Sequence, residues 1–237
     1  MKLSAPIYDL KRKARLLSRE AKIPLHAALD RIAAAEGFSS WGLLAAKAAA
    51  AAPAGKLFAR LAPGDLILVA ARPGHGKTLM SLELAVEAMK AGNRGVFFSL
   101  EYTKSDVLER FRAIGVDLAH FDGLFEFDSS DLISADYIIA ALQSAPRGTL
   151  VVIDYLQLLD QRRENPELMA QIRKLRAFAR ERGLILVFIS QVHRSYDPST
   201  KPCPDIGDVR LPNPLDLSLF NKTCFLNNGE IRYQAAS

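Results

Sequence analysis

The chain has 237 residues, a net charge of +5 at pH 7 and 49% hydrophobic residues, which suit one medium-sized globular domain with a small appendage. No uncharged apolar stretch is long enough to cross a bilayer, and the N-terminus lacks the apolar segment of a signal peptide. We therefore expect a cytoplasmic protein without a membrane partner. Cys203 and Cys224 share no short metal-ligand spacing, and two cysteines make no disulfide framework.

The positive charge is concentrated near the start of the chain. Residues 1–50 contain four acidic residues and nine basic ones, while the remaining residues carry 22 of each sign; the basic ones are Lys2, Lys11, Arg12, Lys13, Arg15, Arg19, Lys22, Arg31 and Lys47. Any general attraction to a polyanion therefore belongs to this segment. Two interpretations stay open, a surface for nucleic acid or an acidic partner, and an amphipathic helix whose charged side is merely solvated.

The first 50 residues read as helices. Apolar residues recur at helical spacing, as at Ile7, Leu10, Ala14 and Leu17. A second helix is expected to start near Pro24 and stop near Gly37, and a third to start after Ser39 or Ser40. Alanines at 48–52, followed by Pro53-Ala54-Gly55, indicate a helix end and a boundary. We predict a basic helical module and linker over residues 1–55 and a larger domain over 56–237.

From residue 64 onward, apolar runs alternate with helical segments. Strands are expected at 65–70, 95–100, 150–154 and 184–190, and helices near 77–91, 103–114, 133–144 and 166–182, with Thr103 to Asp106 capping the second of these helices. Such alternation predicts an α/β fold with a mainly parallel sheet covered by helices on both faces. Near the end, 222–226 and 230–233 flank Asn227-Asn228-Gly229, which predicts a C-terminal β-hairpin at the sheet edge.

A glycine-containing loop separates the first of these strands from a helix. It comprises Ala71, Arg72, Pro73, Gly74, His75, Gly76, Lys77 and Thr78. Backbone N–H groups of such a loop point into a concavity at a helix N-terminus, where phosphate is favoured. Lys77 would reach the outer phosphates of ATP, and the Thr78 hydroxyl would ligate Mg²⁺. The generic pattern has glycine where Ala71 stands, and the alternative is a chance Gly-Lys-Thr turn.

Three further strands end in polar residues that the fold would bring to the same rim as the loop. Asp154 follows 150–153 and would hold Mg²⁺ through water. Glu101 follows 97–100 and would orient and deprotonate the water that attacks the γ-phosphate. Gln191 follows 186–190 and would sense the γ-phosphate. For Asp154 the plainer alternative is a solvated side chain that caps a strand, and for Glu101 it is an ordinary surface side chain before the next helix.

Three other polar residues near this rim carry weaker signals. Arg194, three residues after Gln191, would meet a phosphate or lie in a plain loop, and both interpretations stay open. His75 and His193 are interpreted as loop residues, because no set of His, Cys and carboxylates has transition-metal spacing.

Taken together, four motifs in this order resemble the RecA-like ATPase domain of DnaB-type replicative DNA helicases, over about residues 60–195. They are residues 69–78, residues 98–101, the string Val152-Ile153-Asp154-Tyr155-Leu156-Gln157-Leu158, and residues 189–194. That family also begins its loop Ala-Arg-Pro, which explains Ala71. The resemblance implies a P-loop domain in which Lys77 and Thr78 bind ATP and Mg²⁺, Glu101 is the catalytic carboxylate, Asp154 is the Walker B acid and Gln191 is the switch glutamine.

The chain also departs from that family. Family members carry an N-terminal domain and a linker helix, where about 55 unrelated-looking residues stand here. Their late strand carries a Lys-x-Arg pair that acts as an arginine finger on the neighbour's ATP, and residues 222–229 contain none. The loop expected to bind DNA, between Tyr196 and Leu219, contains five prolines.

The leading hypothesis is a Mg²⁺-dependent ATP hydrolase, related to replicative helicases and acting on or with single-stranded DNA. A second copy of the chain or a partner ATPase would complete its site. Unwinding of DNA is a separate property, because translocation needs coupled subunits. One alternative is a nucleotide-gated adaptor or DNA-binding module with little or no hydrolysis, and another is a vestigial site.

Overall fold

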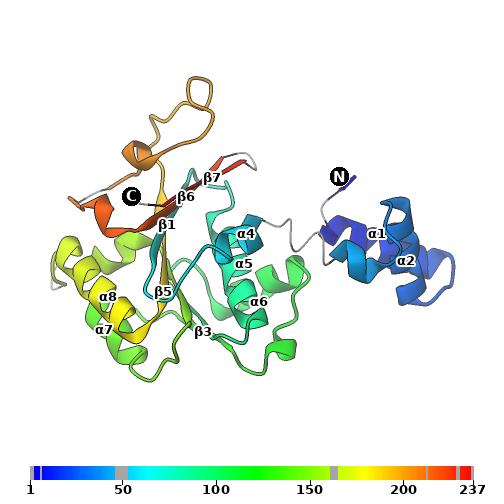
Figure 1. The fold of residues 1–237 in the computed structure, drawn as a ribbon, viewed down its shortest axis with the longest axis horizontal. Coiled ribbons are helices and arrows are strands. Elements are labelled where there is room, and N and C mark those ends of the chain that lie inside the picture. The colour runs from blue at the N-terminus through cyan, green and yellow to red at the C-terminus, as the bar shows by residue number, and fades with distance from the viewer. Residues whose placement is uncertain are drawn as a thin grey trace.

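The body of the protein is built on one seven-stranded sheet in the order β3-β2-β4-β5-β1-β6-β7 (Figure 1). The computed structural model describes residues 3–5, 7–45, 53–160, 165–211, 213–227 and 230–235. Neighbouring strands are parallel except β6 and β7, which pair antiparallel. The strands are β1 (Leu66–Ala71), β2 (Gly95–Ser99), β3 (Phe125–Asp128), β4 (Leu150–Asp154), β5 (Ile185–Gln191), β6 (Lys222–Asn227) and β7 (Glu230–Ala235). The mainly parallel α/β fold predicted from the sequence is confirmed.

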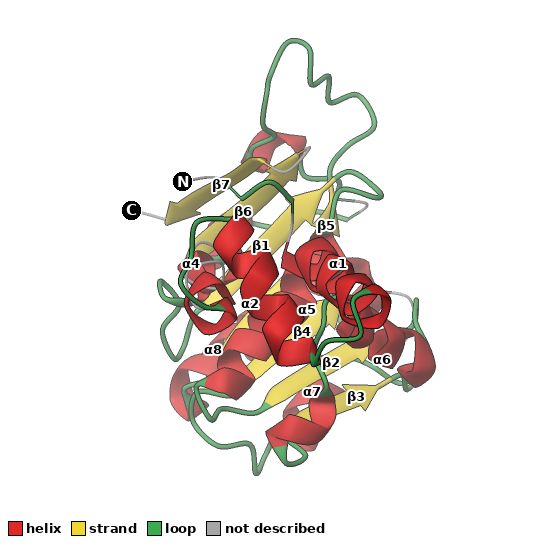
Figure 2. Cartoon of the chain, turned by 90° about the vertical axis from the view of Figure 1, so that its right-hand side faces the viewer, coloured by secondary structure: helices red, strands yellow, loops and turns green. Residues whose placement is uncertain are grey.

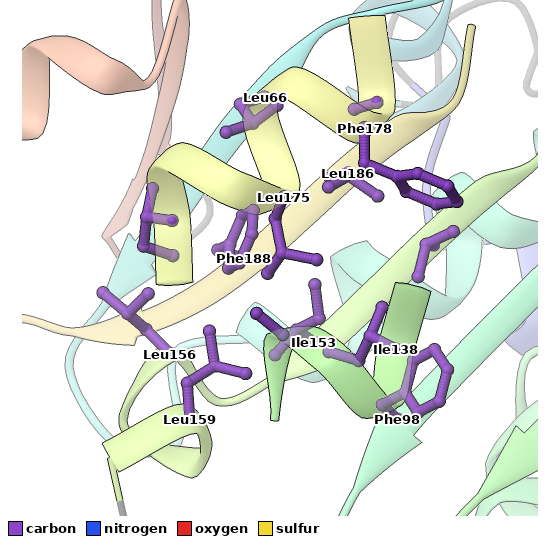
Figure 3. Packing of buried hydrophobic residues seen from close by; sticks show 14 of the residues in the cluster. Leu66, Phe98, Ile138, Ile153, Leu156, Leu159, Leu175, Phe178, Leu186 and Phe188 are labelled. Atoms are coloured by element: carbon purple, nitrogen blue, oxygen red, sulfur yellow. The ribbon is translucent and has the colours of Figure 1, made fainter. Parts of the chain in front are cut away.

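Apolar side chains alternate between two cores because β1, β2, β4 and β5 are buried on both faces. One face packs against α7 (Ala135–Ala141), α8 (Leu168–Arg182) and the 3₁₀ helix η2 (Leu156–Asp160). Figure 3 shows this core, where Leu175 of α8 lies over Phe188 of β5. The other face packs against α4 (Pro53–Phe58), α5 (Lys77–Lys90) and α6 (Lys104–Ala113).

The helices of the body begin and end where local chemistry dictates. Thr103 caps α6: its hydroxyl accepts from the Asp106 N–H, and the Asp106 carboxylate accepts from the Thr103 N–H at 2.8 Å. A cap formed by residues 103–106 was predicted from the sequence. The Ser134 hydroxyl caps α7 by accepting from the Tyr137 N–H, and α8 ends at Gly183 in the left-handed conformation that glycine favours.

A small helical module precedes the body. It comprises α1 (Ile7–Glu20), α2 (Leu25–Ala35) and helical residues 41–45, and it has its own small core of Leu10, Ala33 and Leu44. In Figure 2, which views the molecule from the side of this module, α1 and α2 stand in front of the sheet. No helix within the described ranges is long and apolar enough to cross a membrane.

The predicted end of the module needs one correction. Residues 46–52, where a helix end was expected, lie outside the described residues, and Pro53-Ala54-Gly55 begins helix α4 instead of a linker. Proline suits the first turn of a helix because it has no N–H to leave unsatisfied, and Ala54 and Leu57 are buried in the core beside α5. The domain boundary near residue 55 stays a prediction.

The C-terminal hairpin is confirmed, with β7 as the edge strand of the sheet. The turn residues Asn228 and Gly229 lie outside the described residues. At the opposite edge lies β3, which the sequence reading did not identify as a strand.

Candidate active site

Four parallel strands end at one rim of the sheet, and their last residues lie side by side. Ala71 at the end of β1 pairs with Gln191 at the end of β5, and Ser99 of β2 pairs with Asp154 of β4. A cavity of about 530 Å³ opens at this rim. Its lining includes the five predicted site residues Lys77, Thr78, Glu101, Asp154 and Gln191. Residues as far apart in sequence as 77 and 191 therefore share one cavity.

The loop between β1 and α5 depends on two glycines for its path. Gly74 and Gly76 have φ values of 78° and 86°, a conformation that side chains with a Cβ rarely adopt. A Cβ on either residue would meet nothing within 4 Å, so the requirement is conformational and not steric. Gly76 caps α5 without any side-chain hydrogen bond to the first turn, so backbone donors at this helix start remain available to an anion.

Ala71, Arg72 and His75 are the described loop residues that do not line the cavity. Ala71 is the last residue of β1, is fully buried, and accepts a hydrogen bond from the Val192 N–H at 3.1 Å. Its extended backbone has no need of glycine, which explains why alanine stands where the generic loop pattern has glycine. The role in nucleotide binding predicted for these three residues stays a prediction.

A buried carboxylate and a half-buried ammonium lie close together beneath the loop. The Thr78 hydroxyl donates to the Asp154 carboxylate at 3.3 Å, and the Lys77 ammonium reaches back to the Arg72 carbonyl at 3.5 Å. Burial, and then the neighbouring Glu101 charge, raise the pKa of Asp154 to about 7. Burial lowers the pKa of Lys77 against the opposing pull of Asp154 and Glu101. A bound phosphate and its cation would compensate these charges.

The donor set fits Mg²⁺. A hydroxyl and a carboxylate 3.3 Å apart are the hard oxygen ligands this ion prefers, and it usually takes its remaining ligands from phosphate and water. Within the described ranges, no group of three or more His, Cys, Asp and Glu forms an all-protein metal site. The arrangement therefore suits a cation that arrives with a nucleotide.

Glu101 and Gln191 both line the cavity. Glu101 is exposed two residues after the end of β2, and its N–H donates to the Ser99 hydroxyl at 3.1 Å, which fixes the turn that carries it. Gln191 is half-buried, and its carbonyl accepts from the Arg210 N–H at 2.7 Å. A second cavity, of about 230 Å³, is lined by Tyr155, Gln157, Gln191 and Arg210, so Gln191 and Tyr155 border both cavities.

The structure adds a residue that sequence reasoning missed. Arg110 on α6 lines the cavity, and its guanidinium lies 4.4 Å from the centre of the Tyr102 ring, which also lines it. The positive charge of Arg110 acts on the Asp154 carboxylate. The sequence offered one signal for Arg110: it lies about two turns into the helix that follows Glu101, close in sequence to a predicted site residue.

Other predicted residues lie away from the cavity. Arg194 and His193 are exposed, and the His193 ring lies 2.7 Å from the Ser195 hydroxyl. On β6, Lys222 pairs with Asp65, and the Asn227 amide donates to the Pro202 carbonyl at 2.7 Å. In the part of the chain that is described, Lys77 and Arg110 are therefore the basic side chains that line the cavity.

Comparison with known proteins gives a consistent result. Residues 56–203 match the family described as "ATPase: KaiC". The chain is 30% identical over 177 residues to the replicative DNA helicase DnaB of Synechocystis sp., covering 62% of this chain and 20% of that protein. It is 29% identical over 191 residues to DnaB of Haemophilus influenzae, covering 65% of this chain and 40% of that protein. The chain thus spans well under half the length of these curated relatives.

Solved structures show the same fold. A structure titled as a DnaB-like replicative helicase and its interactions with primase aligns with a TM-score of 0.59 at 19% identity, covering 92% of this chain and 65% of that one. A second structure, titled as an ATPase domain, aligns with a TM-score of 0.58 at 21% identity, covering 71% of each chain. A KaiC-like protein of Pyrococcus horikoshii aligns with a TM-score of 0.52 at 19% identity, covering 72% of this chain and 76% of that one.

Proposed function

Because the chain belongs to the KaiC family of ATPases and is related to DnaB-type replicative helicases, we propose that it binds ATP with Mg²⁺ and hydrolyses the γ-phosphate. The observation that carries this proposal is the convergence of Lys77, Thr78, Glu101, Asp154 and Gln191 on one cavity at the start of α5. A phosphate-binding loop by itself would support only nucleotide binding. Hydrolysis also needs a carboxylate that does not bind the metal, and Glu101 is in a position to supply it.

Each of these residues has a role that its position supports. The backbone of Gly74 and Gly76 and the Lys77 ammonium would hold the phosphates, and Thr78 and Asp154 would hold the cation, which supplies charge neutralisation when bound. Glu101 would orient the attacking water and accept its proton. The amide of Gln191 would contact the γ-phosphate end without competing for the metal.

A cation from outside this chain would complete the site. The described basic residues at the cavity are Lys77 and Arg110, and Lys222 on the late strand is held by Asp65. A cationic group that reaches the γ-phosphate is worth several orders of magnitude in rate in related chemistry. We therefore expect slow turnover by the isolated chain and faster turnover when a second copy or a partner ATPase docks at the cavity.

Single-stranded DNA is the proposed effector, which the names of the helicase relatives suggest. The loop after β5 supports this proposal, because Gln191 borders the nucleotide cavity and is hydrogen-bonded through its carbonyl to Arg210. Arg210 in turn lines the second cavity, where the buried Gln157 amide oxygen has no hydrogen-bond partner among the residues that the structure describes. Single-stranded DNA bound in the second cavity would therefore alter the position of Gln191 through Arg210.

The deciding experiment measures ATP binding and Mg²⁺-dependent phosphate release by the purified chain, with and without single-stranded DNA. Lys77→Ala should abolish ATP binding, and Glu101→Gln should retain binding while slowing turnover by about 100-fold or more, as expected for loss of a general base. Lys104→Ala and Glu109→Gln remove the same charges from exposed positions on α6 and should change neither quantity.

The outcomes separate the candidate functions. Binding without turnover, alone or with DNA, would replace the hydrolase by a nucleotide-gated adaptor. Failure to bind ATP at all would make the site vestigial. Measuring the molecular mass in solution with ATP present tests whether copies of the chain assemble around the site.

A further inference from the structure

Helix α1 carries a basic face that the ATPase site does not use. Arg12, Lys13, Arg15 and Arg19 are exposed along it, and within the described residues Arg15 and Arg19 form no ion pair. The helix is held from the other side, where Leu10 and Ala14 are buried. The module's core therefore fixes which side of α1 meets the solvent, and that side is cationic.

We propose that this face of α1 binds the phosphate backbone of a nucleic acid, as a contact separate from the ATPase cavity. Arg12, Arg15 and Arg19 follow one another at helical spacing, and Arg12 to Arg19 spans about 10 Å at 1.5 Å per residue. That length corresponds to roughly three phosphates along one strand of a double helix, where the rise is about 3.4 Å. Arginine presents a planar fork of donors that matches phosphate oxygens.

The distribution of charge supports a polyanion. The whole excess of +5 lies within residues 1–50, whereas the remaining residues carry 22 charges of each sign. Long-range attraction of a polyanion would therefore be directed to this module and not to the body. A row of charges at regular spacing matches the regular phosphates of a nucleic acid better than an acidic protein surface, whose carboxylates have no such repeat.

The structure disfavours a membrane surface as the occupant. Helices that lie in the membrane interface insert an apolar face opposite their basic one. In α1 the opposite face is already used, because Leu10 is 1% and Ala14 0% exposed in the module's core. Leu16 is half-exposed beside the arginines, but a single leucine side chain buries too little apolar surface to hold the helix in a membrane.

The test is binding of a fluorescently labelled 20-nucleotide single strand to the full chain without ATP, over a range of salt concentrations. Arg15→Ala with Arg19→Ala should weaken binding about tenfold at low salt and reduce the slope of log K against log salt by about 1.4, since each phosphate contact contributes roughly 0.7. The matched control is Arg173→Ala with Arg180→Ala, which removes two exposed charges from α8. The control should bind as the unaltered chain does.

The measurement needs no turnover, so its outcome is independent of the proposed hydrolysis. An unaltered thermal unfolding midpoint would show that both double variants are folded. The proposal fails if the α1 variant keeps its affinity and salt slope, if the α8 variant loses as much, or if the unaltered chain does not bind the strand. It also fails if the chain prefers vesicles rich in anionic lipid and loses that preference in the α1 variant.

Discussion

The two charged regions of the molecule differ in how their charges are held. At the rim of the sheet, Asp154 is 1% exposed, and burial with the nearby Glu101 raises its pKa to about 7. On α1, Arg15 and Arg19 stand in solvent on the outside of a small helical module. Buried charges are costly and persist where a ligand compensates them, while exposed charges cost little and act over a longer range.

This contrast separates two tasks within one chain. The rim concentrates a few groups of both signs in a cavity and suits chemistry on a small anion with its cation. The α1 face spreads charges of one sign along a line and suits attachment to a long anion. Substitutions at the rim should therefore strongly affect ATP turnover and the free energy of unfolding. Substitutions on α1 should affect only the binding of nucleic acid.

The largest effect on stability is expected from Asp154→Asn. In the nucleotide-free protein the raised pKa of Asp154, about 7 against 3.8 unfolded, means that the native state holds a proton that the unfolded chain has lost. The associated stability is fully present below about pH 4 and is lost as pH rises through 7. Urea unfolding without Mg²⁺ should show Asp154→Asn more stable than the unaltered chain at pH 8, by up to about 4 kcal/mol, with less than half of that gain at pH 5.

The comparison for this prediction is Asp131→Asn, which alters an exposed aspartate. It should reproduce the pH dependence of the unaltered chain. If Asp154→Asn keeps the same pH dependence of stability, ionising the Asp154 carboxylate does not destabilise the folded protein. The contrast between a costly charge at the rim and inexpensive charges on α1 would then be wrong. Mg²⁺-dependent turnover should nevertheless fall in Asp154→Asn, since the substitution removes a carboxylate proposed to hold the cation.

A smaller effect is expected from Arg110→Ala. Its guanidinium lines the cavity and stacks on Tyr102, so it would contact phosphate oxygens as charge develops. Because Arg110 is exposed, we expect about a tenfold loss of turnover, or about 1.4 kcal/mol. Arg110→Lys should recover only part of the lost turnover, because an ammonium group does not stack on an aromatic ring and does not present the paired hydrogen-bond donors of a guanidinium. Turnover in Arg112→Ala, which removes an exposed arginine from the same helix, should not change.

The sequence was sufficient where local patterns decide the structure. The buried strands β1, β2, β4 and β5 lie within about one residue of the predicted runs, because continuous apolar segments between helical ones leave few other arrangements. Strand β3 was missed because Phe125–Asp128 alternates over only four residues, too few to stand out. Its place is set by pairing with β2.

The site was predictable to the extent that each residue ends a strand. Lys77, Thr78, Glu101, Asp154 and Gln191 share a cavity because parallel strands end at a common rim. Arg110 was not found, since its position depends on how α6 packs across the rim through Val107 and Phe111. Sequence periodicity alone assigns Arg110 to the solvent side of that helix.

The smallest effect should be on stability in Arg15→Ala with Arg19→Ala. Both side chains are exposed and form no ion pair within the described residues, and alanine favours helices at least as well as arginine does. Exposed substitutions of this kind change the free energy of unfolding by less than about 0.5 kcal/mol each. Chemical denaturation should therefore superimpose on that of the unaltered chain, and ATP turnover without DNA should be equal. A clear loss of stability would mean that these arginines hold the module together, and the assignment of α1 to nucleic-acid attachment would then have to be abandoned.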